Sequence, residues 1–297
     1  MFGAIEAGGT KFVCGVGTGP ADLRTIQFPT TLPEATIGRA IRFLQEESGG
    51  ELKAVGIGSF GPIDLHSASA TFGYITSTPK AGWQNCNLAG AVRDALAVPV
   101  GFDTDVDAAA LGEARWGAAQ NLSDFLYLTI GTGIGGGAII NGRVLHGLVH
   151  PEMGHIRVPH DLVRDAYRGC CPFHGDCLEG LASGPAMQDR WGIAAQDLPA
   201  DHPGWTLEAH YLAHGLANWA LTLSPQRILL GGGVLRQSQL FGRIRHDLAG
   251  LLNGYVRATE VIRDLDQYVV PPQLGDRAGV LGGLVLAEHA YTRLDRE

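Results

Sequence analysis

The chain has 297 residues, which is enough for two modest domains of about 100–200 residues each. Its net charge of −8 argues against a nucleic-acid partner, because nucleic acids attract basic protein faces. No apolar run approaches the roughly 18–20 residues that a membrane span needs, so we expect no membrane partner. The N-terminal residues MFGAIEAGGTKF do not have the pattern of a signal peptide, and we expect a cytoplasmic location.

One arrangement of predicted elements occurs twice along the chain. Residues 2–17 read as an apolar strand, a glycine turn and a second strand, which is typical of a β-hairpin. A helix over 34–47 and a glycine-ended strand over 54–62 come next. The same order of hairpin, helix and strand returns over 126–145, 207–223 and 227–234. The repeat predicts two similar α/β domains that face one another.

The remaining segments set the expected domain boundaries. Residues 98–102 (VPVGF) read as a strand, and the alanine-rich residues Val106–Trp116 read as a helix. The chain between Pro151 and Gly204 is loop-rich and reads as an insertion on the second domain. The predicted domains are 1–117, with the closing helix 278–297 packed back on it, and 118–277, which includes the loop insertion 150–180.

The 43 glycines fall mainly in short groups between apolar segments, where the backbone approaches a ligand or takes a positive φ. Gly8-Gly9-Thr10-Lys11 lacks the P-loop spacing, but the N–H groups of such a turn can bind an anion, as an alternative to a plain β-turn. The second group, 131–137, precedes a strand instead of the helix of a dinucleotide-binding fold. Two facing hairpins, one from each domain, would clamp a triphosphate between them.

Three aspartates cluster where the strand at 98–102 meets the next helix. Ligands of open α/β sheets bind at the carboxyl ends of strands, and phosphoryl transfer requires a carboxylate to accept the hydroxyl proton. One aspartate at such a junction is often only a helix N-cap. Three at alternating positions beside two glycine turns favour chemistry, and we select Asp105, between Asp103 and Asp107, as the general base.

The five cysteines are an odd number, and we expect no disulfide framework. Cys171, His174 and Cys177 have a C-x-x-H-x-x-C spacing, which suits Zn²⁺. Structural zinc takes four ligands, and His155 is the natural fourth. Cys170 could replace Cys171, and a chance grouping of buried thiols is the alternative to a metal site.

These motifs, in their order GGTK, DTDVDAAALGE, GTGIGGG, HPEMGH and the Cys/His cluster, resemble the ROK family of sugar kinases (repressor, open reading frame, kinase). The resemblance spans nearly the whole chain. It implies two ribonuclease-H-like domains of the actin-like ATPase and hexokinase type, which flank a cleft with ATP and Mg²⁺, and a homodimer. It also implies a structural Zn²⁺.

The resemblance also assigns roles to single residues. Asp105 becomes the catalytic base. The residues expected to bind ATP are Gly8, Gly9, Thr10, Lys11, Gly131, Thr132, Gly133 and Gly135 at the phosphates and Gly231, Gly232 and Gly233 on the adenosine side. The residues expected to bind the sugar are Asn85, Thr104, Glu152, His155 and Glu179.

Several departures from the family pattern resemble its fructokinase branch. Thr104 stands in place of an amide that would touch the sugar, and Glu6 replaces the usual aspartate of the first strand. The sequence thus predicts transfer of phosphate from ATP to D-fructose, giving D-fructose 6-phosphate. Alternatives are a kinase for glucose, mannose or an N-acetylhexosamine, and a non-catalytic sugar sensor or regulator. A dinucleotide oxidoreductase is disfavoured by the strand after residue 137.

Overall fold

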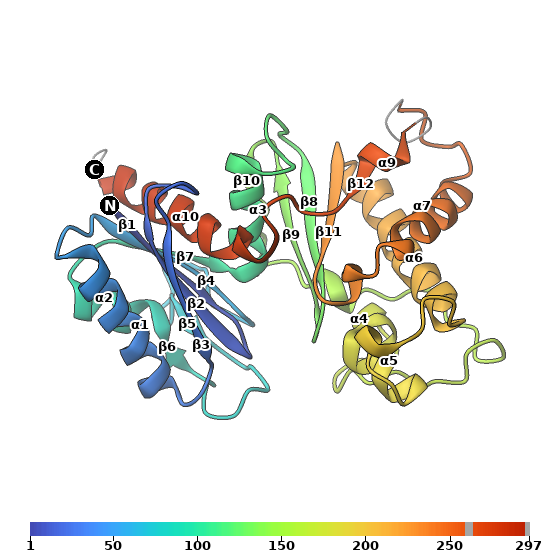
Figure 1. Cartoon of the computed structure of the whole chain (residues 1–297), viewed down its shortest axis with the longest axis horizontal. Helices are drawn as coiled ribbons and strands as arrows, with labels where there is room; N and C mark the ends of the chain where they lie inside the picture. Colours follow the sequence, from blue (N-terminus) through green and yellow to red (C-terminus); the bar gives the residue numbers. More distant parts are fainter. Residues whose placement is uncertain (259–263, 295–297) are drawn as a thin grey trace. The chain divides into compact units, whose positions relative to one another are not determined.

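The computed structural model describes residues 1–258 and 264–294, which form two compact units (Figure 1). The first unit contains Met1–Gln120, Leu145–His150 and the chain from Gln273 onward. The second contains Asn121–Val144 and Pro151–Pro272. Each unit therefore combines segments that are far apart in the sequence.

The first unit contains a five-stranded mixed sheet in the order β3-β2-β1-β4-β7. β1 and β2 form a hairpin, β3 continues it in antiparallel fashion, and β4 and β7 add parallel strands beside β1. Every residue of β4 is buried, as in a strand that is covered on both faces. The bounds are Phe2–Ala7 (β1), Lys11–Gly17 (β2), Arg24–Pro29 (β3), Ala54–Ser59 (β4) and Val100–Thr104 (β7).

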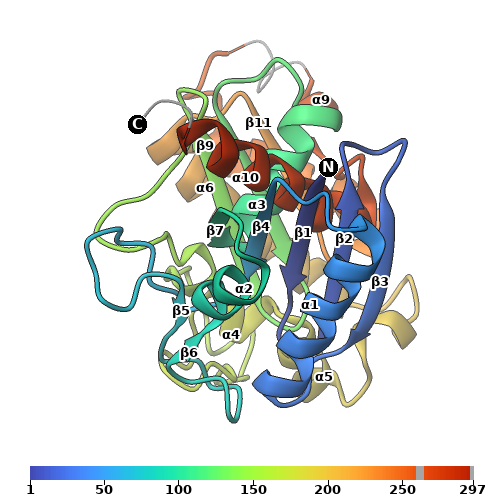
Figure 2. The same cartoon turned by 90° about the vertical axis from the view of Figure 1, so that its left-hand side faces the viewer.

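Helices cover both faces of this sheet. α1 and α2 lie on one face, and α3 and α10 lie on the other, as Figure 2 shows from the side of α1 and α2. α10 comes very close to β4 and α3. A Cβ on Gly56 would overlap the backbone of Gly283, and a Cβ on Gly282 would overlap that of Ala108. The bounds are Pro33–Ser48 (α1), Leu88–Leu96 (α2), Asp105–Trp116 (α3) and Ala278–Leu294 (α10); the short strands β5 (Tyr74–Ile75) and β6 (Cys86–Asn87) precede α2.

A buried carboxylate joins α3 to the segment that precedes α10. Glu113 has no solvent exposure and accepts hydrogen bonds from the backbone N–H groups of Ala118 (2.7 Å), Gln273 (3.1 Å) and Leu274 (2.8 Å). Hydrogen bonds to a charged acceptor are stronger than neutral ones. This contact attaches the end of the chain to the helix that begins with Asp105.

The second unit repeats the arrangement of the first, with a sheet in the order β10-β9-β8-β11-β12. β8 and β9 form a hairpin, and β11 runs parallel to β8, as β4 does to β1. α6 and α7 pack against one another in this unit (Figure 1). The bounds are Phe125–Ile130 (β8), Ile134–Ile140 (β9), Arg143–Val144 (β10), Leu178–Ala182 (α4), Gly184–Trp191 (α5), Gly204–Leu223 (α6), Arg227–Gly231 (β11), Gln239–Leu252 (α7), Leu265–Tyr268 (α9) and Val269–Val270 (β12). Short 3₁₀ turns of the described residues lie at Met153–His155, Ala195–Asp197, Val234–Arg236 and Gly275–Arg277.

The predicted repeat is confirmed. Both glycine hairpins form, the helix predicted over 34–47 is α1, and the one over 207–223 is α6. The closing helix is α10. The sequence did not indicate α2, α5 or α7. Over residues 1–258 and 264–294, none of the helices has both the length and the apolar character that a bilayer crossing requires.

Candidate active site

Asp105 is the first residue of α3, directly after the parallel strand β7. Its Oδ1 accepts a hydrogen bond from the N–H of Val106 (2.9 Å), and its side chain is half-buried. Acidic side chains are favoured in a first helical turn, because the helix dipole is positive there. The fold thus presents this carboxylate at the carboxyl end of a strand, where α/β folds place ligands.

Thr104, predicted to touch the sugar, is the N-cap of α3. Its buried hydroxyl donates to Oδ2 of Asp107 (2.6 Å) and accepts from the N–H of the same residue (3.1 Å). The hydroxyl has one proton, and it donates this proton in the hydrogen bond to Asp107. Thr104 can therefore offer a sugar no hydrogen-bond donor in this conformation.

A histidine that sequence reasoning missed lies beside the other two aspartates. Nε2 of His146 is 3.0 Å from Oδ1 of Asp103 and 3.8 Å from Oδ2 of Asp107. Both carboxylates are buried, whereas the His146 side chain is 38% exposed. The hydrogen bond to Asp103 and the nearby carboxylate of Asp107 raise the pKa of His146 to about 10. No spacing in the sequence indicated this contact, because 43 positions separate His146 from Asp103.

Glu6, at the end of β1, carries a second carboxylate near Asp105. Burial, together with the negative charge of Asp105, raises the pKa of Glu6 to about 7, although the positive charge of Lys11 opposes this rise. Its Oε2 atom is buried and has no hydrogen-bond partner. A buried carboxylate oxygen without a partner is a ligand suited to a hard cation such as Mg²⁺. Glu6 therefore fits the role of a ligand for Mg²⁺ or for its bound waters.

The first predicted phosphate turn, Gly8–Thr10, closes the β1–β2 hairpin. The N–H of Gly8 donates to the carbonyl of Lys11 (3.0 Å), and a Cβ on Gly8 would lie 2.7 Å from that oxygen. A Cβ on Gly9 would meet nothing within 4 Å. Nζ of Lys11 donates to Oε1 of Gln27 (3.3 Å). The turn is thus fixed at Gly8 and open to a ligand at Gly9.

The second predicted phosphate turn is shorter than the glycine run suggests. Gly131, Thr132 and Gly133 form the turn between β8 and β9, while Gly135 already lies within β9. The predicted sugar ligand Glu179 supports this turn, because its Oε2 accepts from the N–H of Ile134 (2.9 Å). A Cβ on Gly133 would come 2.7 Å from the same carboxylate oxygen.

The glycines predicted for the adenosine side follow β11. Gly231 ends that strand, and Gly232 has a φ of +96°. A Cβ on Gly232 would overlap the backbone of Ile130. Gly233 begins the turn Val234–Arg236, and a Cβ there would meet nothing within 4 Å. Gly232 is therefore required by the fold, while Gly233 leaves room for a ligand.

Three of the predicted sugar residues lie together in the second unit. Burial raises the pKa of Glu152, while the neighbouring His155 opposes this rise and the negative charge of Glu179 adds to it. Glu152 and His155 are adjacent through the turn Met153–His155, where the N–H of His155 donates to the carbonyl of Glu152 (3.0 Å). Asn85, in the first unit, is exposed with a φ of +56°.

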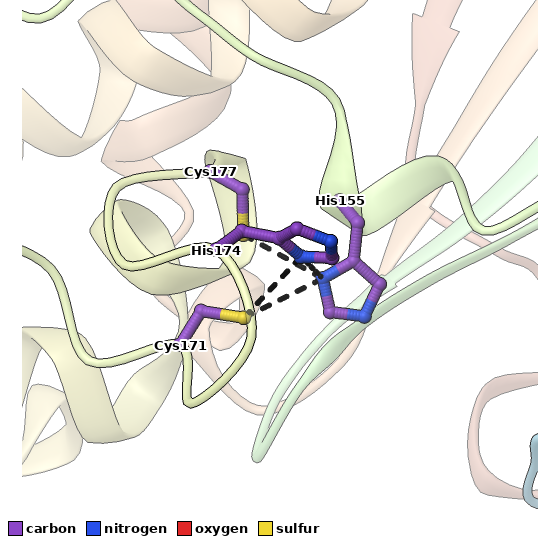
Figure 3. A group of neighbouring side chains, drawn as sticks. All are labelled: His155, Cys171, His174 and Cys177. Atoms are coloured by element: carbon purple, nitrogen blue, oxygen red, sulfur yellow. Dashed lines mark hydrogen bonds between the residues drawn. The ribbon is translucent and has the colours of Figure 1, made fainter.

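The four predicted zinc ligands also lie together (Figure 3). Nδ1 of His155 is 3.7 Å from Sγ of Cys171, 3.5 Å from Sγ of Cys177 and 3.3 Å from Nδ1 of His174. Sγ of Cys171 is 3.6 Å from Nδ1 of His174. Zinc bonds of about 2.3 Å to sulfur and 2.0–2.1 Å to nitrogen, at tetrahedral angles, put nitrogen and sulfur about 3.6 Å apart and two nitrogens about 3.3 Å apart. The donor set and its spacing fit a tetrahedral zinc ion.

The local backbone explains how this cluster forms. Cys171 and Gly175 pair across a tight loop in which Gly175 has a φ of +64°, and Cys177 pairs with Arg157 after the 155 turn. Cys171 and Cys177 are buried, whereas Cys170 is exposed and outside the cluster. Because Nδ1 of His155 faces the cluster, its Nε2 points away from the other three side chains (Figure 3).

Replacement of Glu6 by Gln is expected to change how stability depends on pH in metal-free protein. Glu6 has a pKa of about 7 when folded and an ordinary value near 4.5 when unfolded, so its ionisation costs stability as pH rises from 4.5 to 7. Glu6→Gln removes this cost. Denaturant unfolding should find the variant roughly 2–3 kcal/mol more stable above pH 7 than wild type, relative to their difference at pH 4.

Glu46→Gln, the same substitution at an exposed position of α1, is the control for the change of side chain. A constant difference between Glu6→Gln and wild type from pH 4 to 8 would contradict the burial of an ionisable Glu6.

Known proteins resemble this chain over its whole length. Residues 2–290 match the ROK family. A relative from Bacillus subtilis (strain 168) is 50% identical over 291 residues, which are 98% of this chain and 96% of the relative. A fructokinase from Lactococcus lactis subsp. cremoris is 42% identical over 294 residues, 98% of each protein.

Solved structures agree with this assignment. A ROK family glucokinase from Streptomyces griseus, in complex with glucose and AMPPNP, has a TM-score of 0.76 at 27% identity, and the match covers 97% of this chain and 99% of that one. The chain therefore belongs to the ROK family, and its α/β fold is that of the family's sugar kinases.

Proposed function

We propose that this protein is an ATP-dependent fructokinase that transfers the terminal phosphoryl group of ATP to the 6-hydroxyl of D-fructose. The observation that carries the proposal is the full-length similarity to a fructokinase, at 42% identity. The similarity to the Streptomyces griseus glucokinase is lower, at 27%. Glucose, mannose and N-acetylhexosamines are the alternative acceptors.

Asp105 is the proposed general base. Phosphoryl transfer asks the protein chiefly to position the reactants and stabilise charge, together with a carboxylate that accepts the proton of the attacking hydroxyl. Asp105 is fixed at the start of α3 and is only half-buried, so an incoming hydroxyl can reach it. Its Oδ1 accepts a hydrogen bond from the N–H of Val106, which holds the carboxylate in place.

ATP and Mg²⁺ are the proposed nucleotide partners. The turn with Gly9, Thr10 and Lys11 would offer N–H groups, a hydroxyl and a positive charge to phosphate, and Glu6 would hold the metal or its waters. Bound Mg²⁺ neutralises charge on the phosphates. The turn Gly131–Gly133 and the open position at Gly233 are the further residues that we propose for ATP.

Glu152, His155 and Glu179 are the proposed hydroxyl ligands of the sugar. Carboxylates accept hydrogen bonds from hydroxyl groups, and His155 directs one ring nitrogen to the Cys/His cluster and the other away from it. Asn85 would add an amide. The hydroxyl of Thr104 is occupied by Asp107, which supports a sugar pocket unlike one with an amide at this position.

The Cys/His cluster is the proposed site of a structural zinc ion. All four tetrahedral positions would be filled by protein side chains, which leaves none for a substrate. The ion would orient the ring of His155 and the loop that carries it, and would thus act on the sugar only through His155. A homodimer and a cytoplasmic location remain predictions from the sequence.

Asp105→Asn should remove the base while keeping the fold. We expect kcat for fructose phosphorylation to fall by about 10²–10⁴-fold, with the melting temperature nearly unchanged. ADP release and circular dichroism measure the two quantities. Asp94→Asn, at an exposed position of α2, is the matched control and should retain full activity. A kcat for Asp105→Asn within a factor of two of wild type would exclude Asp105 as the base.

Metal analysis should find about one zinc ion per chain. Cys171→Ser should lose the ion and lower the melting temperature, because the loop loses its cross-link, whereas Cys170→Ser should keep both at the wild-type level. The neighbouring thiol thus serves as the matched control. Zinc-free wild-type protein of undiminished stability would refute the site, and loss of zinc in Cys170→Ser alone would transfer the ligand role to Cys170.

A further inference from the structure

Two buried carboxylates stand on either side of Asp105 in the sequence and turn toward the same histidine. Asp103 ends up beside His146 at 3.0 Å, and Asp107 at 3.8 Å. Their side chains are 7% and 1% exposed. Oδ1 of Asp107 is buried without a hydrogen-bond partner. Two carboxylates that are buried beside the same side chain repel one another unless a cation lies between them.

His146 supplies that cation. Asp103 and Asp107 are the groups that raise its pKa, and burial, which opposes them, is outweighed. Burial in turn raises the pKa of Asp107, and the imidazole of His146, 3.8 Å away, offsets part of this rise. The three side chains could also ligate a divalent cation, since their ligand atoms lie within 4.8 Å of one another. The direct contact of 3.0 Å favours a proton on the imidazole instead.

The same cluster fixes the backbone around Asp105. Oδ1 of Asp103 accepts from the N–H of Thr104 (2.9 Å), and Thr104 caps Asp107 through two hydrogen bonds. The side chains on both sides of Asp105 are therefore held, and His146 joins them. Without the imidazolium, two buried charges would face each other across the junction of β7 and α3.

We propose that His146 is a positioning residue, which as an imidazolium holds Asp103 and Asp107 together and so sets the direction of Asp105. The inference rests on the proposed role of Asp105 as base. His146 touches neither reactant in this account. It acts through the strand–helix junction, and its loss displaces the base without removing it.

His146→Gln tests the proposal, because the amide keeps hydrogen bonding and loses the charge. We expect kcat for fructose to fall by about 10–100-fold with KM changed by less than about threefold, since misplacement of a catalytic group acts on the chemical step. His66→Gln, at an exposed position of the same unit, is the control and should behave as wild type. Unchanged kcat in His146→Gln would overturn the proposal.

A double-mutant cycle separates charge compensation from general disruption. Asp107→Asn removes one of the two carboxylate charges, so the loss of the imidazolium should matter less in its presence. We expect His146→Gln to reduce kcat by less than about threefold in the Asp107→Asn background. Losses that multiply as independent effects would contradict the charge-compensation role.

A titration by NMR reads the charge of His146 directly, independent of turnover. In chelator-treated wild type, the His146 imidazole should stay protonated beyond pH 8. Loss of the His146 proton below pH 7 would overturn the proposal. A wild type without kinase activity would refute the proposed function. The role of His146 at this junction would then be decided by the NMR titration and by the same double-mutant cycle, with the free energy of unfolding measured in place of kcat.

Discussion

The close approach of α10 to β4 and α3 is the constraint on which the first unit depends. Gly56 and Gly283 allow a helix to rest on the backbone of a central strand, and Gly282 allows the same helix to rest on α3. Interiors are packed so densely that an added methyl group at such a contact must displace backbone. Glu113 completes the arrangement by attaching the chain before α10 to α3. The helix that begins with Asp105 is thereby held on two sides.

This packing concentrates negative charge at one edge of the sheet. Glu6 lies at the end of β1, and three aspartates lie at the end of β7 and the start of α3. Isolated, such charges would be costly to bury. Three features offset this negative charge: the helix N-terminus at Asp105, Lys11 near Glu6, and His146 beside Asp103 and Asp107. In the proposed reaction, Glu6 would hold Mg²⁺ and Asp105 would act as the base.

Local patterns in the sequence predicted much of the fold. Glycine between apolar runs identified both hairpins, and three-residue spacing brought out a Cys/His cluster whose four members do lie together. Contacts between distant segments escaped prediction, because spacing carries no information about them. His146 is the clearest case. The short glycine groups indicated a ligand or a positive φ, but Gly56 and Gly283 serve a third purpose, the close packing of α10 on β4.

The proposed activity of this ROK family protein is the phosphorylation of fructose. The most direct measurement is ADP release by purified protein with ATP and Mg²⁺ across fructose, glucose, mannose and N-acetylated hexosamines. We predict a kcat/KM for fructose that exceeds the others by about tenfold or more, as expected when a pocket built for certain hydroxyls rejects sugars that present them differently. A higher kcat/KM for another hexose, or no turnover with any sugar, would contradict the account.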